Sequence, residues 1–176
     1  MRNRGKLDPS VVALGTKIIP IIYQSKKLGL SEPHVIITSS YRVPIDKFIL
    51  EFPGGLLDPK ETIEQCALRE LKEETGYHGK KVLASMNPSN IVSYTDPWKS
   101  DDNEVLQFIE VDLDDPINEF PKQKLDSSEV INVHIVKLSK MREEVEELCK
   151  TRGFVLDAQV YAFAASLGLF KLIFKA

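Results

Sequence analysis

The chain has 176 residues, which is about the size of one domain. Its 26 acidic and 23 basic residues give a net charge of −3, which argues against sequence-independent binding of nucleic acid. Two cysteines, Cys66 and Cys149, are too few for a disulfide scaffold and indicate a reducing compartment. The longest apolar run, residues 160–170, is too short to span a bilayer, and no signal peptide is visible. We therefore expect a soluble cytoplasmic protein that can also enter the nucleus.

Strand and helix signals alternate along the chain. Runs of β-branched and apolar residues predict strands at residues 11–23, 34–38, 48–52, 81–85, 105–111 and 130–136. Helical patterns cover residues 62–75, 139–150 and 157–170. Strands before, between and after helices predict an α/β or α+β layer fold, with a mixed sheet covered by helices. We expect residues 1–10 to be a flexible N-terminus and residues 11–176 to form a single domain.

The first helix has recognisable ends. Thr62 is followed three residues later by Gln65, which is the pattern of a capping box. Gly76 stands where a left-handed residue closes a helix. Upstream, Gly54 and Gly55 follow the third predicted strand in a turn, where glycine lets the backbone approach a metal ion or a phosphate closely.

The acidic residues of this helix do not form a separate solvent-facing side. At about 100° per residue, its apolar side chains share one face, formed by Ile63, Cys66, Ala67 and Leu71. Glu70 and Glu74 fall in the middle of that face, and Glu73 falls at its edge. Arg69 alone cannot balance these acids, which repel one another more strongly when they lose contact with water. A hard divalent cation with oxygen ligands, above all Mg²⁺, is the natural counter-ion and would suit phosphate chemistry.

A longer motif contains these acids. Its seven fixed residues are Gly55, Glu61, Arg69, Glu70, Glu73, Glu74 and Gly76. Their spacing resembles the box, here residues 55–77, that defines the Nudix hydrolases. Only Tyr77 departs slightly, because a branched aliphatic residue is commoner at that position. The resemblance implies a Nudix-type α/β/α sandwich with a mixed β-sheet and a loop–helix–loop metal motif.

Further segments resemble the ADP-ribose (ADP-sugar) pyrophosphatase branch of that family. They are Tyr41-Arg42-Val43-Pro44, Glu51-Phe52-Pro53-Gly54-Gly55-Leu56-Leu57-Asp58, the strand from Glu129 to Val136, and Leu156-Asp157-Ala158-Gln159-Val160. The resemblance implies a Mg²⁺-dependent enzyme, with Mn²⁺ as a substitute. Such an enzyme hydrolyses the diphosphate of ADP-ribose or a related ADP-sugar to AMP and a sugar phosphate.

The same resemblance assigns roles within the motif. The residues expected to hold the metal are Gly54, through its carbonyl, and Glu70, Glu73 and Glu74, and the three glutamates are also expected to be catalytic. The residues expected to be structural are Gly55, Glu61, Arg69 and Gly76. In this second set, Glu61 and Arg69 are expected to form an internal ion pair that braces the loop–helix–loop.

Five positions outside the motif receive predictions. Arg42 is expected to reach the substrate diphosphate, or else to be a solvated cation at the end of a strand. Glu129 is expected to activate or position the attacking water, or else to be a surface acid. Asp157 is predicted to cap a helix and His134 to lie on the surface of a strand. Trp98, the only tryptophan, is expected to stack a nucleobase, to cover its loop or to contact a second subunit.

Two features depart from this branch of the family. Its members usually carry an N-terminal extension that is swapped between subunits and grips the adenine with aromatic residues. Here the catalytic pattern begins near Val11, and neither Trp nor Tyr precedes Tyr23. The resemblance implies a homodimer, and this difference weakens that inference. Trp98 also stands in a loop where the family usually has Gly. The acids beside it would disfavour a highly charged polyphosphate and favour a diphosphate; they are Asp101, Asp102 and Glu104.

Two alternatives to ADP-sugar hydrolysis stay open. A Nudix hydrolase of another nucleoside diphosphate derivative, such as a different nucleotide sugar or a dinucleotide, would share the same motif. A nucleotide-sugar-binding module could keep the fold without turnover, although the cost of the intact acid cluster argues against it. In each case we expect a small-molecule ligand and neither nucleic acid nor a membrane as a partner.

Overall fold

The structure, a computed structural model, describes residues 13–83 and 92–174. The strands are β1 (Gly15–Ile22), β2 (His34–Arg42), β3 (Lys47–Glu51), β4 (Gly54–Leu56), β5 (Lys81–Val82), β6 (Val92–Tyr94), β7 (Asn103–Glu110), β8 (Ile131–Lys137) and β9 (Val155–Leu156). The helices are α1 (Ile63–Thr75), α2 (Met141–Arg152) and α3 (Ala158–Phe174). Short 3-10 turns occur at Val43–Ile45, Pro116–Asn118 and Leu138–Lys140.

These strands form one mixed sheet. Its main order is β5-β7-β1-β2-β3-β9, with β4 added to β1, β6 to β7 and β8 to β2. β1 runs parallel to β7, whereas β2 is antiparallel to β1, β3 and β8. β2 serves three neighbours because β8 pairs along most of its length, while β1 pairs only with its first residues and β3 only with its last.

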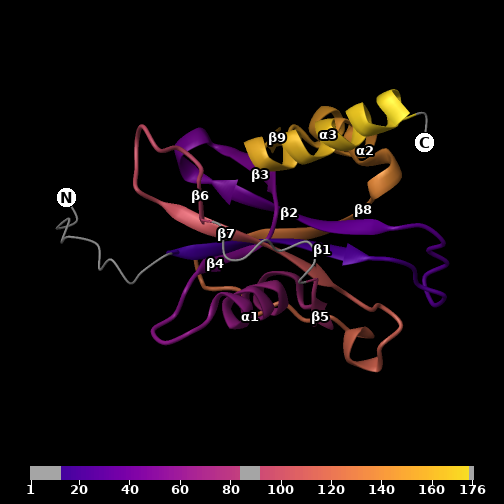
Figure 1. Cartoon of the computed structure of the whole chain (residues 1–176), viewed down its shortest axis with the longest axis horizontal. Coiled ribbons are helices and arrows are strands. Elements are labelled where there is room, and N and C mark those ends of the chain that lie inside the picture. The colour runs from indigo at the N-terminus through magenta and orange to yellow at the C-terminus, as the bar shows by residue number, and fades with distance from the viewer. Residues whose placement is uncertain (1–12, 84–91, 175–176) are drawn as a thin grey trace.

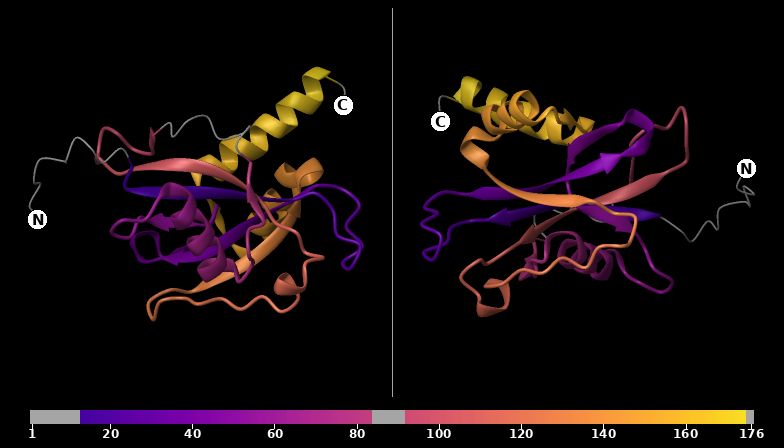
Figure 2. Two further views of the ribbon diagram at one scale, coloured as in Figure 1. Left: turned by 60° about the horizontal axis from the view of Figure 1, so that its bottom comes forward. Right: turned by 180° about the vertical axis from the view of Figure 1, so that it is seen from behind.

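Helices cover both faces of the sheet (Figure 1). α1 packs on one face, while α2 and α3 pack on the other. Alternate residues of β1 divide between two buried clusters, since Ile18 and Ile22 face α1 whereas Ile19 and Ile21 face the other two helices. Seen from behind, β8 and α2 lie toward the viewer (Figure 2, right). The predicted fold class, a mixed sheet between helices, is confirmed.

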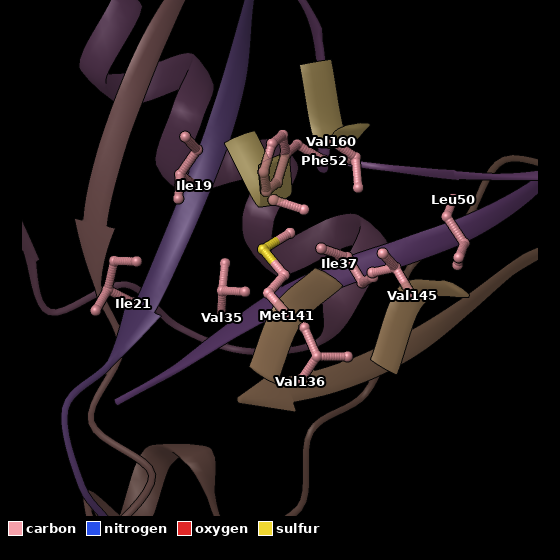
Figure 3. Close-up of a cluster of buried hydrophobic side chains, with 11 residues drawn as sticks. Ile19, Ile21, Val35, Ile37, Leu50, Phe52, Val136, Met141, Val145 and Val160 are labelled. Carbon is pink, nitrogen blue, oxygen red and sulfur yellow. The ribbon is translucent and has the colours of Figure 1, made fainter. Parts of the chain in front are cut away.

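One buried cluster fills the space between the sheet and the helices α2 and α3 (Figure 3). Val35, Ile37 and Leu50 reach it from β2 and β3, and Met141 and Val145 reach it from α2. Full burial of an aliphatic side chain of this size contributes roughly 1.5–3 kcal/mol. The cluster therefore fixes α2 and α3 against the sheet on the side away from α1.

Three short strands were not among the predicted elements. They are β4, β6 and β9. The glycines of β4 predict a turn, yet Gly54 and Gly55 pair with Lys17 and Thr16 of β1. This pairing joins residues almost forty positions apart, so it leaves no periodic signal in the local sequence. It matters because the glycines of β4 lie against α1.

His134 corrects the expectation of a surface position. It is half-buried on the side of β8 that faces α2, with Nε2 at 3.0 Å from Ser39 Oγ. Its ring also packs against Phe154, with 5.9 Å between the ring centres. Burial lowers the pKa of His134. The alternation of polar and apolar residues in β8 predicts a half-exposed strand, but Phe154 packs on the polar face at His134.

Other expectations have mixed outcomes. Asp157 caps α3 as predicted, because its Oδ1 accepts a hydrogen bond from Gln159 N at 2.8 Å. Cys66 and Cys149 are free thiols. No helix among residues 13–83 and 92–174 is long and apolar enough to cross a membrane. The expectation for residues 1–10 and the predicted strand end at 84–85 lie outside the described residues.

Candidate functional site

Helix α1 has the ends that its sequence predicts. Thr62 Oγ1 accepts a hydrogen bond from Gln65 N at 3.2 Å, and Thr62 N donates to Gln65 Oε1 at 2.9 Å, which completes the capping box. Gly76 closes the helix at φ 78°, and its N–H donates to Lys72 O at 2.8 Å. A Cβ at Gly76 would stand 2.5 Å from Lys122 N, so this glycine also admits the segment that crosses the helix end.

The acids of α1 meet the two glycines of β4. Glu70 packs directly on Gly55, because a Cβ at that position would lie 2.2 Å from Glu70 Oε1. Glu74 Oε2 accepts a hydrogen bond from Gly54 N at 3.0 Å. A residue without a side chain is what lets a carboxylate come this close to the backbone. The two acids that periodicity places on the apolar face therefore lie against the strand, at the predicted turn.

Burial raises the pKa of both carboxylates. Loss of contact with water raises the pKa of Glu74 to about 8, although the N–H of Gly54 acts in the opposite direction. Burial also raises the pKa of Glu70, against the hydrogen bond from Arg69. The charge of Glu70 contributes to the raised pKa of Glu74. Two desolvated like charges at this spacing form an electrostatic arrangement that a bound cation would stabilise.

Arg69 bonds to three acids of the motif, Glu61, Glu70 and Glu73. Its Nε and Nη2 donate to the two carboxylate oxygens of Glu61, each at 2.8 Å. Its Nη1 donates to Glu70 Oε1 at 2.7 Å and to Glu73 Oε2 at 3.2 Å. Hydrogen bonds from Arg69 lower the pKa of Glu61 to about 2. The expected ion pair between Glu61 and Arg69 is thus present, and it ties the loop before α1 to the helix.

The segment before β8 closes the C-terminal end of α1. Lys124 N donates to Glu73 O at 2.8 Å, and Gln123 Nε2 donates to Glu74 O at 2.6 Å. The same Nε2 donates to Ile131 O, at the start of β8, at 3.1 Å. Lys124 Nζ lies 3.3 Å from Glu73 Oε1. These bonds satisfy carbonyl groups that the end of a helix leaves free, and they bring the segment to the acids.

Glu129 lies on this segment at the edge of the site. Its Oε2 accepts a hydrogen bond from Asp126 N at 2.8 Å, and its own N–H donates to Asp126 O at 2.9 Å. The side chain is exposed, and its charge contributes to the raised pKa of Glu70. Glu129 is therefore within electrostatic reach of Glu70, while its carboxylate is bonded to its own turn.

Arg42 is held by an acid that the sequence analysis did not single out. Arg42 Nη2 lies 2.7 and 2.8 Å from the two carboxylate oxygens of Glu51 on β3. Lys17 Nζ lies 3.7 Å from Glu51 Oε2, so this buried acid has a cation on each side. The charge of Glu51 also contributes to the raised pKa of Glu74. A charged residue at the end of an apolar strand was the signal that could have identified Glu51.

A cavity of about 210 Å³ opens beside the glycines of β4. Its polar lining residues are Thr16, Lys17, Thr95, Asp102, Asn103 and Glu104. Gln159 Nε2 donates to Glu104 Oε1, and burial raises the pKa of Glu104. Gln159 Oε1 is buried without a hydrogen-bond partner in the described part of the chain. The cavity thus offers carboxylates, a cation and hydroxyl groups next to the acids of α1, which suits a polar ligand.

Trp98 is not among the residues that line this cavity. It stands at the surface with 79% of its area exposed, and Lys99 Nζ lies 4.3 Å from the centre of its ring. Lys99 is itself held by Asp96, with Nζ at 2.7 Å from Oδ2. The structure therefore gathers the acids and glycines of the motif, keeps Arg42 within reach of their charge and leaves Trp98 outside.

The oxygen donors of α1 and β4 suit a hard cation such as Mg²⁺. Within residues 13–83 and 92–174, however, no three His, Cys, Asp or Glu side chains stand close enough together to hold a metal ion as placed. In this arrangement Glu70 is bonded to Arg69 and Glu74 to Gly54 N.

Comparison with known proteins agrees with this arrangement. Residues 26–152 match the NUDIX domain, and on that basis the chain belongs to the Nudix family. An uncharacterised Nudix hydrolase of Schizosaccharomyces pombe is 40% identical over 135 residues, which are 77% of this chain and 63% of that protein. The ADP-ribose pyrophosphatase of Saccharomyces cerevisiae is 36% identical over 133 residues, which are 76% of this chain and 55% of that protein.

The likeness extends to a solved structure. The crystal structure of an ADP compounds hydrolase superposes with a TM-score of 0.57 and 17% identity, covering 89% of this chain and 72% of that chain. At this identity the likeness concerns the fold alone. The chain spans less than two thirds of the length of both relatives named above.

Proposed function

We propose that this protein is a Mg²⁺-dependent pyrophosphatase that hydrolyses ADP-ribose, or a related ADP-sugar, to AMP and a sugar phosphate. The observation that carries the proposal is the placement of Glu70 and Glu74 against Gly55 and Gly54, with the pKa of both carboxylates raised by burial. Such a pair is costly unless a cation compensates its charge. The yeast relative named ADP-ribose pyrophosphatase supports the choice of substrate.

The donor set of the site fits a hard divalent cation. The ligands would be the carbonyl oxygen of Gly54 and the carboxylates of Glu70, Glu73 and Glu74, and Mn²⁺ would substitute because it accepts the same oxygen donors. When bound, the cation would draw charge from the diphosphate oxygens and so lower the barrier to attack by water. Arg69 would keep Glu70 and Glu73 oriented, because its guanidinium already bonds both.

The reaction consumes one water molecule. Its oxygen bonds to one phosphorus, and the bridging oxygen leaves with the other, so that each product carries one phosphate. Glu129 would position this water or accept its proton, since it lies within reach of Glu70 on a segment that Gln123 fastens to α1. For this step the Glu129 carboxylate would have to exchange its bond to Asp126 N for one to water.

The substrate would occupy two places around the acids. Arg42 would bind the diphosphate through a guanidinium that Glu51 now holds at the edge of the sheet. One arm of the substrate would enter the cavity beside β4, where Asp102 and Glu104 can accept hydrogen bonds from sugar hydroxyls. For the base to stack on Trp98, the turn that carries Trp98 would have to move toward this cavity.

Release of AMP from ADP-ribose tests the proposal. We expect AMP only when Mg²⁺ or Mn²⁺ is present, and we expect Glu74→Gln to abolish it. Glu146→Gln is a matched control, because it makes the same change of charge on α2, away from the site, and should keep full activity. Absence of AMP from the unmutated protein with either metal would contradict the ADP-ribose assignment, and a panel of other nucleoside diphosphate derivatives would then identify the substrate.

We further propose that the protein is a cytoplasmic homodimer. The end of α3 projects past the sheet (Figure 2, left), and it exposes Leu169, Leu172 and Ile173, whose apolar surface suits a contact between subunits. Sedimentation equilibrium of the unmutated protein and of Leu172→Glu would test the dimer. A monomer at micromolar concentration would contradict it.

A further inference from the structure

β8 lies at the edge of the sheet, and part of this edge is open. Leu138 N bonds toward the β2 side, whereas Ile131 O and Lys137 N bond away from it. Because backbone groups alternate in direction along a strand, Val133 and Ile135 also direct their N–H and C=O groups away from β2. These four groups have no hydrogen-bond partner in the described part of the chain. An open edge of this kind can accept a further strand.

A groove of about 420 Å³ beside the open edge is lined by residues of β8 and α2. These two elements lie toward the viewer in Figure 2 (right). Its floor is formed by His134, Ile135 and Val136 of β8 and by Leu148 of α2. Glutamates of α2 form its rim. An additional strand at this edge would therefore have every second side chain over β8 pointing toward α2, along the groove.

The rim is acidic, and two of its glutamates have no ion-pair partner in the described part of the chain. Glu144 Oε2 accepts a hydrogen bond from Lys137 N at 3.1 Å, which leaves Glu143 and Glu147 one helical turn apart. Neither of these two forms an ion pair with a described residue. Arg142, on the same helix, pairs with Glu146, with Nε at 3.0 Å from Oε1. Arg152, at the end of α2, is not among the residues that line the groove, although after burial its charge helps to lower the pKa of His134 on the groove floor.

We propose that the β8 edge and its groove bind an extended segment of a partner protein that carries Lys or Arg at alternate positions. The segment would add to β8 as an antiparallel strand and pair with the free groups of Val133 and Ile135. Its basic side chains would face Glu143 and Glu147. This surface lies on the face opposite α1, so the proposal does not depend on the proposed hydrolysis.

The spacing of the acids suits such a strand. Side chains one helical turn apart are about 5–6 Å from one another, and alternate side chains of an antiparallel strand are about 6.8 Å apart. Two basic residues at positions i and i+2 of the segment can therefore reach Glu143 and Glu147 together. In the antiparallel arrangement these residues stand opposite His134 and Val136, and the residue between them stands opposite Ile135 and pairs with it.

The charge of the rim selects a partner over a second copy of this chain. A two-fold pairing of β8 with itself would place α2 beside α2 of the other copy, and their glutamates would face one another. Like charges at such a contact are destabilising. A basic strand removes this repulsion, so we commit to a heterologous segment.

Fluorescence anisotropy with synthetic peptides tests the pairing. The probe is a labelled heptapeptide, Thr-Lys-Val-Lys-Val-Lys-Thr, titrated with the full chain at low salt. We expect N-methylation of the two valines to abolish binding, because their N–H groups face β8, and N-methylation of the lysines to leave it nearly unchanged. Equal binding of both methylated peptides, or loss confined to the lysine-methylated one, overturns the proposed pairing.

Variants of α2 test the acidic rim. We expect Glu143→Gln with Glu147→Gln to weaken binding of the probe about fivefold, which is the size expected for two exposed ion pairs, and Glu146→Gln to leave it unchanged. Far-UV circular dichroism should be the same in all of these variants, which verifies their fold without reference to the proposed hydrolysis. The proposal is overturned if Glu146→Gln weakens binding of the probe equally. It is also overturned if the unmutated chain forms a dimer that the peptide does not displace and that the double variant of Glu143 and Glu147 does not form.

Discussion

Two acidic helices lie on opposite faces of the same sheet, and they treat their glutamates differently. The acids of α1 near β4 and Arg69 are Glu70, Glu73 and Glu74, and the acids of α2 that line the groove are Glu143, Glu144 and Glu147. The first group lies against the glycines of β4 and shares one arginine, whereas the second borders an open groove. Each group has three carboxyl groups, but loss of contact with water makes it far more costly to ionise the first group. Desolvation, rather than acidity, is what makes one cluster suited to an ion and the other to a basic chain.

The largest effect is expected from Glu74→Gln. Hydrolysis of ADP-ribose should fall at least about 100-fold, as it does when a preorganised electrostatic contact is lost from an active site. Stability at neutral pH should stay the same or rise by about 1 kcal/mol. Burial raises the pKa of Glu74 to about 8, so folding at pH 7 requires this carboxyl group either to take up a proton or to stay charged without water, and glutamine needs neither. Steady-state kinetics and urea unfolding without metal would measure both. Loss of activity together with marked destabilisation would instead indicate a structural role for Glu74.

A comparison of two glycines sharpens the same point. Gly55→Ala would place Cβ 2.2 Å from Glu70 Oε1, so we expect displacement of that carboxylate, a loss of activity of tenfold or more and destabilisation of about 1–3 kcal/mol. Gly168→Ala, in α3, meets only Arg142 Cδ at 3.7 Å and should stabilise the protein by up to about 1 kcal/mol. Thermal unfolding and initial rates of the two variants would provide the test. Full activity of Gly55→Ala would contradict the close packing of Glu70 on β4.

Acid pH should weaken the ion pair that anchors α1. The pKa of Glu61 is about 2 in the folded protein, below its ordinary value of 4.5, because Arg69 donates hydrogen bonds to its charged form. Its contribution to stability is therefore complete above about pH 4.5 and is lost as the pH falls toward 2. We expect Glu61→Gln to lower the free energy of unfolding by about 1–2 kcal/mol at pH 7, and by progressively less as the pH falls below 4.5. A pH-independent difference in urea unfolding would argue against the ion pair.

The smallest effect is expected on α2. Glu143→Gln with Glu147→Gln removes two like charges one turn apart, so the stability should change by less than about 0.5 kcal/mol, toward higher stability. Thermal unfolding at low salt would detect this change, and ADP-ribose hydrolysis should be unaffected. A destabilisation above 1 kcal/mol would show that these acids, like those of α1, have a partner inside the protein.

The sequence predicted α1 more completely than any other part of the site. Its capping box, its final glycine and the position of Glu70 and Glu74 all depend on residues within one helix, where a period of 3.6 residues relates sequence to space. The ion pair of Arg69 with Glu61 followed from the motif and is present as well. The roles of these residues in metal binding and hydrolysis stay predictions until they are measured.

What the sequence did not predict depends on contacts between distant segments. β4 forms because its glycines pair with β1, and Glu51 faces Arg42 because two strands are in a particular register. His134 is half-buried because its ring packs on Phe154, a residue that follows α2 in the chain. Polar alternation in a strand indicates only that its two faces differ, so it does not reveal whether a later segment covers the polar one.

Gln123 adds one more property to the site. Its amide nitrogen bonds Glu74 O on α1 and Ile131 O on β8, so a single side chain spans the helix with the acids and the strand that follows Glu129. The parts of the site therefore share one anchor, and a displacement of α1 is passed on to the segment that carries Glu129. Insertions between Lys124 and Glu129 would lengthen the tether without moving its ends, whereas loss of the Gln123 amide would leave Lys124 to join this segment to α1. Tolerance to changes in this loop is thus governed by the contacts at its start rather than by the length of the loop.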